Sequence, residues 1–262
     1  MPSPNHDTLA GIHQAADLIR AAQHVVVLTG AGSSTPSGVP DFRSPGSGLW
    51  NRFSPMKSAT LTAFRRNPEE FYDFVRPLVS LIHQAHPNPA HLALAELEKR
   101  QFIQSIITQN IDGLHQRAGS RVVIEVHGTL NSLTCLGCYQ QYSSTGFLEL
   151  FIEQGDIPRC PSCNNILKPD VILFEEQLPY EAWIMATQET KACDAMIIAG
   201  SSLEVFPVAD LPWKAYQNQA AIIVINKTPT YIDPYAQVIL NGDVADIIPQ
   251  IVEELHHAQA PG

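Results

Sequence analysis

Two C-x-x-C pairs are the residues whose chemistry is easiest to predict in this sequence. Cys135 and Cys138 form the first pair, and Cys160 and Cys163 form the second. This spacing is typical of four-thiolate zinc ribbons, with a metal-free hairpin as the alternative. Four thiolates fill a tetrahedral shell and leave no position for water, so we expect one structural Zn²⁺ that stabilises the segment around it. The fifth cysteine, Cys193, lies beside an apolar run and is expected to be a core thiol.

A glycine-rich turn, Gly30-Ala31-Gly32, directly follows the apolar run Val25–Leu28. Glycines at the end of a strand let the backbone approach a pyrophosphate, although a plain turn can carry the same residues. The dehydrogenase fingerprint is incomplete, because Thr35 replaces its third glycine and no acid lies between Asp41 and Glu69 to hold a ribose. The turn therefore predicts a phosphate-binding loop and disfavours an ordinary hydride-transfer enzyme.

Polar side chains that suit a dinucleotide site follow this turn and two later apolar runs. Arg43 can contact phosphate and Phe42 can cover a nicotinamide ring, or the two can belong to an ordinary surface pair and a buried aromatic. Asn110 and Asp112 follow the run Phe102–Thr108, where ligand groups collect in α/β folds but where local turns also favour these residue types. His127 follows another run and is either structural or a candidate base, since imidazole titrates near neutrality.

The elements that must position these side chains alternate between strands and helices. Short apolar runs predict strands at Val25–Leu28, Phe102–Thr108, Val122–Val126, Val171–Phe174, Ala195–Ala199, Ala221–Ile225 and Val238–Leu240. Amphipathic spacing predicts helices at Leu9–Ala22, Pro68–Gln84, Ala90–Lys99, Ala182–Lys191 and Val244–His256. This order predicts an α/β fold with a doubly wound, mostly parallel, Rossmann-like sheet that binds its ligand at the strand ends.

Two segments interrupt the alternation and predict a smaller lobe. Ser33–Pro55 is rich in Pro, Gly and Ser and leads into the helix at Pro68–Gln84, where Pro77 is expected to cause a bend. Thr129–Lys168 contains both cysteine pairs. We expect a Rossmann-like, nucleotide-binding domain over residues 1–43, 89–128 and 169–262, a loop with a helical insertion over 44–88, and a zinc-ribbon insertion over 129–168.

Composition excludes several classes of protein. With 45% hydrophobic and 16% charged residues, the chain can bury a large core. Its 26 acidic and 16 basic residues disfavour direct nucleic-acid binding and suit basic protein partners. No secretory pattern occupies Met1–Thr8 and no run of ~18 apolar residues could span a membrane, so a cytoplasmic location without membrane partners is expected.

Taken together, these stretches resemble the sirtuins from Val27 to about Ile248, in the order of that family. The resemblance is carried by GAGSSTPSGVPDFR (30–43), TQNIDGLH (108–115), VHG (126–128), the four cysteines, KPDVILFEE (168–176), GSSLEVFPVA (200–209), Asn226 and GDV (242–244). It implies an NAD-dependent protein-lysine deacetylase, or deacylase, acting on acyl-lysine proteins. NAD would be the cosubstrate, Zn²⁺ would be structural, and the products would be nicotinamide, O-acetyl-ADP-ribose and free lysine.

The resemblance also implies roles for individual residues. His127 would be the general base that activates a ribose hydroxyl after the acyl oxygen has attacked the ribose, and Asn110 would assist catalysis. The NAD site would comprise Gly30, Ala31, Gly32, Asp41, Phe42, Arg43, Gln109, Asn110, Asp112, His127, Gly200, Ser201, Ser202, Asn226 and Val244. The zinc ligands would be Cys135, Cys138, Cys160 and Cys163. Substrate contacts would come from Val171, Phe174, Glu175, Glu176 and Val205.

This sequence departs from the family pattern at three places. Ser33 stands where the family has isoleucine, which we expect to alter loop packing. Glu175 replaces the glycine of Phe-Gly-Glu, and we hypothesise that its carboxylate favours basic residues around the target lysine. Unchanged relative rates on basic and acidic peptides in Glu175→Gly would refute this. Sirtuins that remove succinyl or malonyl groups carry a Tyr-x-x-Arg pair on this helix, and here Tyr72 is followed by Val75 at the position of the arginine. Arg76 is about 100° further around the helix, so a neutral acyl group, acetyl first, is expected.

Two rival functions share these motifs. One is protein ADP-ribosyl transfer or NAD hydrolysis, which would release ADP-ribose without an acyl group. The other is a non-catalytic zinc-ribbon interaction module that senses NAD. Retention of His127, Asn110 and Asp112 disfavours the second rival, since a protein without activity does not need them.

Overall fold

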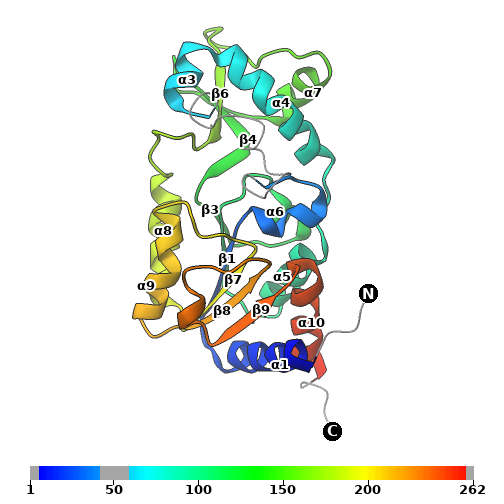
Figure 1. The fold of residues 1–262 in the computed structure, drawn as a ribbon. Helices are drawn as coiled ribbons and strands as arrows, with labels where there is room; N and C mark the ends of the chain where they lie inside the picture. Colours follow the sequence, from blue (N-terminus) through cyan, green and yellow to red (C-terminus); the bar gives the residue numbers. More distant parts are fainter. Residues whose placement is uncertain (1–5, 42–58, 258–262) are drawn as a thin grey trace.

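The computed structural model describes residues 6–41 and 59–257, and its main part is a six-stranded parallel sheet (Figure 1). The strands are β1 (Val25–Thr29), β2 (Ser105–Thr108), β3 (Val123–Glu125), β7 (Ala195–Ala199), β8 (Ala221–Asn226) and β9 (Val238–Asn241). Their order across the sheet is β3-β2-β1-β7-β8-β9. This is the doubly wound order: successive strands are added toward one edge from β1 to β3 and toward the other edge from β7 to β9. The predicted Rossmann-like fold is confirmed.

Helices cover both faces of this sheet, as its buried strands require. α1 (His6–Ala21), α5 (Pro89–Lys99) and α10 (Val244–His257) lie on one side, and α8 (Tyr180–Ala192) and α9 (Leu211–Gln217) lie on the other (Figure 1). Successive residues of β1 alternate between the two cores: Val25 and Val27 pack with the first group of helices, and Val26 and Leu28 with the second. The continuous apolar run in the sequence therefore reflects burial on both faces.

The smaller lobe combines an antiparallel sheet with a helical insertion (Figure 1). The sheet has the order β5-β4-β6, with β4 (Gly128–Cys135), β5 (Gln141–Ser143) and β6 (Leu167–Val171). The helices of this lobe are α3 (Leu61–Arg66), α4 (Pro68–Gln84) and α7 (Thr145–Glu153). Aromatic side chains form its core, where Tyr72 packs edge to face against Phe64, Phe71 and Phe151.

One predicted strand is wrong, and its position matters for the site. The run Val171–Phe174 is not a strand of the parallel sheet, because β6 ends at Val171 and pairs antiparallel with β4. The run is apolar for a different reason: Val171 and Leu173 are buried in the core of the smaller lobe. Residues 172–176 thus form a connection between the lobes. The domain boundaries drawn from the sequence remain predictions.

The other elements of residues 6–41 and 59–257 are short. They are α6 (Leu114–Ala118) and the 3-10 turns at Ala31–Ser33, Thr35–Ser37, Val208–Asp210 and Asp233–Tyr235. The helix at Pro68–Gln84 has the predicted bounds and includes Pro77 in its interior. In the described part of the chain, no helix has both the length and the apolar character needed to cross a membrane.

Candidate functional site

A cavity of about 990 Å³ opens between the two lobes, at the carboxyl ends of β1, β2, β7 and β8. Its lining includes every predicted NAD and substrate residue that the structure describes: Gly30, Ala31, Gly32, Asp41, Gln109, Asn110, Asp112, His127, Val171, Phe174, Glu175, Glu176, Gly200, Ser201, Ser202, Val205, Asn226 and Val244. Phe42 and Arg43 lie outside the described residues. The fold thus brings together side chains from segments more than two hundred residues apart in the chain.

The loops after β1 and β7 touch backbone to backbone, which explains their glycines. The amide of Gly32 donates to the carbonyl oxygen of Gly200 at 2.9 Å. A Cβ at Gly32 would lie 2.8 Å from that oxygen, and one at Gly200, whose φ is +62°, would lie 2.4 Å from the Ser33 nitrogen. Side chains are therefore excluded from this junction at the sheet's switch point, where a pyrophosphate binds in doubly wound folds.

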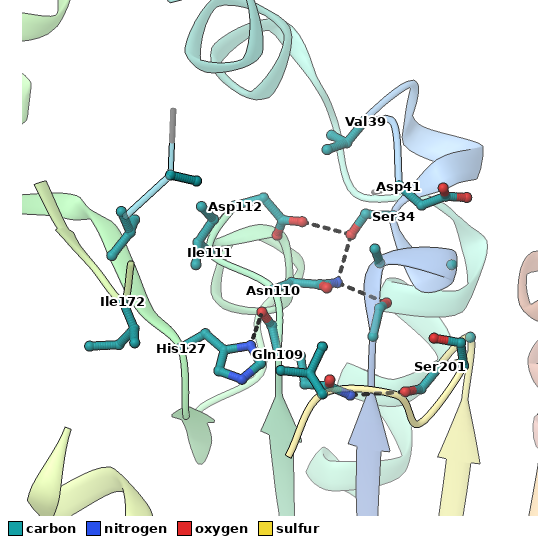
Figure 2. A pocket seen from close by; sticks show the side chains of 18 of the residues that line it. Ser34, Val39, Asp41, Gln109, Asn110, Ile111, Asp112, His127, Ile172 and Ser201 are labelled. Atoms are coloured by element: carbon teal, nitrogen blue, oxygen red, sulfur yellow. Dashed lines mark hydrogen bonds between the residues drawn. The ribbon is translucent and has the colours of Figure 1, made fainter. Parts of the chain in front are cut away.

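Asn110 is buried at the end of β2, with its amide nitrogen held by the first loop (Figure 2). Its Nδ2 donates to the carbonyl oxygen of Gly30 at 3.1 Å and to the hydroxyls of Ser33 and Ser34 at 3.0 Å. Ser33, which stands where isoleucine is usual, thus adds a polar contact to this side chain. These bonds fix the amide orientation and leave Oδ1 as the atom of Asn110 that can accept from a ligand hydroxyl.

Asp112 is joined to Asn110 through Ser34 (Figure 2). The Ser34 hydroxyl donates to Asp112 Oδ2 at 2.7 Å, and the Leu114 amide donates to Oδ1 at 2.9 Å. The carboxylate therefore also anchors the start of α6. Sequence reasoning did not assign a role to Ser34, because the hydrogen bonds that define its role come from residues far along the chain.

His127 lies between β3 and β4, half-buried, with its ring facing the cavity (Figure 2). Its Nδ1 is 3.2 Å from the carbonyl oxygen of Gln109. A carbonyl oxygen can only accept, so Nδ1 carries the proton of the neutral ring and Nε2 has the lone pair. A neutral imidazole held in this tautomer can accept a proton at Nε2. The backbone carbonyl oxygen of His127 accepts a hydrogen bond from the Ile172 amide at 2.9 Å, which joins His127 to the connection between the lobes.

Two further histidines, neither predicted as site residues, lie behind the cavity. His91 and His115 are fully buried, with ring centroids 4.7 Å apart. Burial lowers the pKa of His91 to about 4, against the opposing effect of Asp112. Burial, and then the neighbouring His91, lowers the pKa of His115 to about 3. His115 Nε2 lies 3.0 Å from the Thr29 hydroxyl, so these neutral rings support the strand ends.

These two histidines predict that acid destabilises the fold. In the unfolded chain both rings bind protons below about pH 6.5, whereas in the folded chain they stay neutral until about pH 4 and 3. The free energy of unfolding should therefore fall as the pH drops below about 6.5, by about 2 kcal/mol for each ring between pH 7 and 5. Urea titrations across this range should show a shallower pH dependence in His115→Phe than in the wild type, with His83→Phe, whose side chain is exposed, as the control. Equal slopes in all three proteins would contradict this assignment.

At the other end of the cavity, Ser201 links the ends of three strands (Figure 2). Gln109 Nε2 donates to the Ser201 hydroxyl at 2.9 Å, and Asn226 Nδ2 donates to the Ser201 carbonyl oxygen at 3.1 Å. Lys227, beside Asn226, pairs with Asp243 at 2.7 Å, one residue before α10 begins at Val244. The polar groups predicted to hold the adenosine end are thus fixed by one another.

The four predicted zinc ligands lie together in the smaller lobe, and their Sγ atoms are all within 4.8 Å of one another. Tetrahedral Zn²⁺ with bonds of about 2.3 Å separates its sulfur ligands by about 3.8 Å, so this cluster fits the ion. The amides of Gly137 and Cys138 donate to Cys135 Sγ, and Asn165 donates to Cys163 Sγ, which suits thiolate ligands. None of the four cysteines is among the described residues that line the cavity, so a zinc ion here would be structural.

Comparisons with known proteins agree with this geometry. The family model described as the Sir2 family matches residues 30–207. NAD-dependent protein deacylase 2 of Archaeoglobus fulgidus is 44% identical over 245 residues, covering 93% of this chain and 96% of that protein. A solved Sir2 enzyme superposes with a TM-score of 0.89 at 43% identity, covering 95% of this chain and 99% of that one.

A second solved structure contains ligands. It is a Sir2 protein with a deacetylated p53 peptide and 3′-O-acetyl-ADP-ribose, similar at TM-score 0.87 and 37% identity, covering 93% of this chain and 98% of that one. The family match spans more than half of the chain, and the relatives align along nearly all of it. The chain therefore belongs to the Sir2 family, the sirtuins.

Proposed function

We propose that this sirtuin is an NAD-dependent protein-lysine deacetylase that transfers the acyl group to ADP-ribose. The observation that carries the proposal is the position of His127, whose ring lines the same cavity as Asn110 and the two glycine loops, with Nδ1 held by the Gln109 carbonyl oxygen. The names of the relatives, an NAD-dependent deacylase and a Sir2 protein with a deacetylated peptide and acetyl-ADP-ribose, support it.

The cavity suits NAD. When bound, NAD supplies a ribose carbon that accepts the acyl oxygen as nicotinamide leaves. The two glycine loops, which pack backbone to backbone at Gly32 and Gly200, line the part of the cavity proposed for the pyrophosphate. Ser201, Ser202, Asn226 and Val244 line the end proposed for adenosine. Asn110 offers its Oδ1 to the nicotinamide ribose, and His127 Nε2 takes the proton of a ribose hydroxyl. The four cysteines hold Zn²⁺ outside the cavity, where it stabilises the smaller lobe and takes no part in the chemistry.

The acyl group is proposed to be neutral. One face of α4 lines the cavity with apolar side chains, namely Phe71, Phe74, Val75, Leu78 and Ile82. Tyr72 is turned away, since its hydroxyl donates to the Leu167 carbonyl oxygen at 2.6 Å. Arg76 is also turned away, because it pairs with Asp73 and donates to the Gly155 carbonyl oxygen. Among the described residues of the lining, the one Lys or Arg is Lys227, which pairs with Asp243.

This lining predicts strong discrimination against acidic acyl groups. We expect kcat/KM for an acetyl-lysine peptide to exceed that for the succinyl-lysine peptide by about 100-fold or more, because a buried carboxylate without a cation is costly. An octanoyl group should be accepted within about tenfold of acetyl, since it extends over apolar surface. Val75→Arg should raise the relative rate on succinyl-lysine, whereas Leu81→Arg, at an exposed position of α4, should not. Equal rates of the wild type on acetyl and succinyl peptides would refute the assignment.

The proposed macromolecular partners are acyl-lysine proteins. A net charge of −10 favours basic protein partners over nucleic acid. We also propose a cytoplasmic location, which suits four cysteines placed to hold a metal as thiolates instead of forming disulfides. Fractionation of cells that produce the chain, probed with a specific antibody, tests this location.

Product analysis tests the function. Purified zinc-loaded protein is incubated with NAD and an acetyl-lysine peptide, and all products are followed by mass spectrometry. Nicotinamide, free-lysine peptide and acetyl-ADP-ribose in equal amounts are expected. Nicotinamide and ADP-ribose without deacetylated peptide would identify a hydrolase or ADP-ribosyltransferase instead. No consumption of NAD over a panel of acyl peptides would favour the non-catalytic module.

A further inference from the structure

Glu175 has a backbone conformation that is unfavourable for its residue type. Its φ is +77°, in the left-handed region where a side chain other than glycine is strained. It lies in the connection between the lobes, which we call the substrate segment (residues 171–176) because it includes four of the five predicted substrate contacts. A strained residue persists only where its surroundings compensate, so the contacts of Glu175 indicate what the side chain does.

Those contacts are made within the protein. Glu175 Oε2 accepts a hydrogen bond from the Thr62 amide at 3.0 Å, in the first turn of α3. The hydroxyl of Thr62, and then its amide, lower the pKa of the Glu175 carboxyl, as expected for a carboxylate that accepts hydrogen bonds. Among the described residues, no basic side chain pairs with Glu175. Its charge is thus directed at α3.

The backbone of Phe174, next to Glu175, also pairs with the residues at the start of α3. The Phe174 amide donates to the Ala59 carbonyl oxygen at 2.9 Å, and the Leu61 amide donates to the Phe174 carbonyl oxygen at 3.1 Å. Thr60 and Phe174 form a parallel bridge. Glu175 therefore extends a short backbone pairing by one side-chain contact. We call the whole set, between residues 59–62 and residues 174–175, the α3 clip.

The rest of the substrate segment is fixed independently of Glu175. Lys168 Nζ, almost fully buried, lies 2.8 Å from Glu176 Oε2 and donates to the Val171 carbonyl oxygen at 2.9 Å. The Leu173 amide donates to the same Glu176 oxygen at 2.8 Å, and the Ile172 amide donates to the His127 carbonyl oxygen. The ion pair and His127 thus hold residues 171–173 and 176 of the segment, and the α3 clip holds residues 174 and 175 between them.

We propose that Glu175 is a positioning residue, which holds the substrate segment against α3 so that its backbone is ordered before an acyl-lysine peptide binds. This deepens the proposed function and rests on it. A glycine at this position would relieve the strain but would lose the contact with Thr62. Ordering the segment in advance lowers the cost of binding and therefore lowers KM for the peptide. Because the carboxylate accepts from Thr62, the preference for basic peptides that the sequence suggested is not expected.

Steady-state kinetics on matched variants test this proposal. Glu175→Gly should raise KM for an acetyl-lysine peptide by about three- to tenfold, alike for peptides with basic and with acidic flanks. KM for NAD and kcat should change by less than about twofold. Glu175→Gln, whose amide oxygen can still accept from Thr62, should lie between Glu175→Gly and the wild type. Glu181→Gln removes an equal charge from the exposed first turn of α8 and serves as the control.

Either of two results would overturn the proposal. One is an unchanged or lower peptide KM in Glu175→Gly. The other is a KM change confined to basic peptides and fully reproduced by Glu175→Gln, which would assign the carboxylate to reading peptide charge.

Hydrogen exchange separates this proposal from the proposed function, since it needs no activity. In Glu175→Gly the amides of Leu61, Thr62 and Phe174 should exchange about tenfold faster or more, while that of Leu173, bonded to Glu176, should change little. Unchanged protection at Thr62 would refute the α3 clip even in a protein that proved to be an active deacetylase. If these amides exchanged faster in Glu175→Gly but the wild type had no deacetylase activity, the α3 clip would be supported and the proposed function would be refuted.

Discussion

Replacing His127 by alanine is expected to lower kcat for deacetylation by about 10²- to 10⁴-fold, the usual contribution of a positioned general base. The Gln109 carbonyl oxygen holds the proton on Nδ1, so Nε2 is the atom that accepts the proton from a ribose hydroxyl. Alanine removes this acceptor and leaves the glycine loops and Asn110 in place. KM for NAD should therefore change by less than about threefold, since the variant loses a group used in the chemical step and little binding.

Single-turnover experiments make the His127 prediction specific. They should show that nicotinamide release falls less than peptide deacetylation, because the base acts after nicotinamide has left. His13→Ala, which changes an exposed histidine on α1, is the matched control. Deacetylation within about tenfold of the wild type in His127→Ala would show that another group is the base.

The sequence predicted those elements of the fold whose burial produces a continuous apolar run. β1 and β7 are buried along their whole length, so their apolar runs identified them directly. The run at Val171–Phe174 has the same pattern, but Val171 and Leu173 are buried in the core of the smaller lobe, and sequence alone does not distinguish these two kinds of burial. Once the parallel sheet was predicted, the positions of Asn110 and His127 at strand ends followed from the topology rule.

The unpredicted part of the site depends on contacts between distant segments. The role of Ser34 comes from Asp112, and that of His115, in α6, comes from Thr29, at the end of β1. The family resemblance placed Glu175 among the substrate contacts, and it did not indicate that the carboxylate accepts from Thr62, in the helical insertion. Such partners are set by how segments far apart in the sequence pack together, which no local periodicity encodes. Residue type at these positions indicated a polar contact without indicating its partner.

Removing zinc is expected to lower the thermal stability of the protein strongly, because the ion stabilises the smaller lobe and takes no part in the reaction. The apolar cluster around the ribbon is small: Leu133, Leu167, Cys135 and Cys160 are its buried members, with Tyr142 and Phe147 packed against them. Metal binding contributes about 10 kcal/mol or more to the folding of isolated four-ligand zinc sites, far more than so small a core can supply. We therefore expect Cys138→Ser, or a strong chelator, to lower the melting temperature by about 10 °C or more.

Activity should be lost together with this lobe, although the cysteines do not line the cavity. β4 begins at Gly128, directly after His127, and β6 ends at Val171, where the substrate segment begins. Disorder in the ribbon would therefore leave both His127 and the substrate segment without a fixed position. Returning Zn²⁺ to the chelated protein should restore folding and kcat together, at one ion per chain. Co²⁺, which accepts the same tetrahedral thiolate shell, should restore a similar kcat, because the metal takes no part in the reaction.

Cys193→Ser provides the control for zinc content. Cys193 is buried beside β7, away from the ribbon, so this variant should keep one zinc ion per chain even if the buried hydroxyl lowers its stability. Metal analysis after gel filtration gives the stoichiometry of each protein. A Cys138→Ser protein that retained both its zinc and its melting temperature would exclude Cys138 as a ligand. A kcat that differed widely between the Zn²⁺ and Co²⁺ forms at equal thermal stability would assign the metal a chemical role and overturn its assignment as structural.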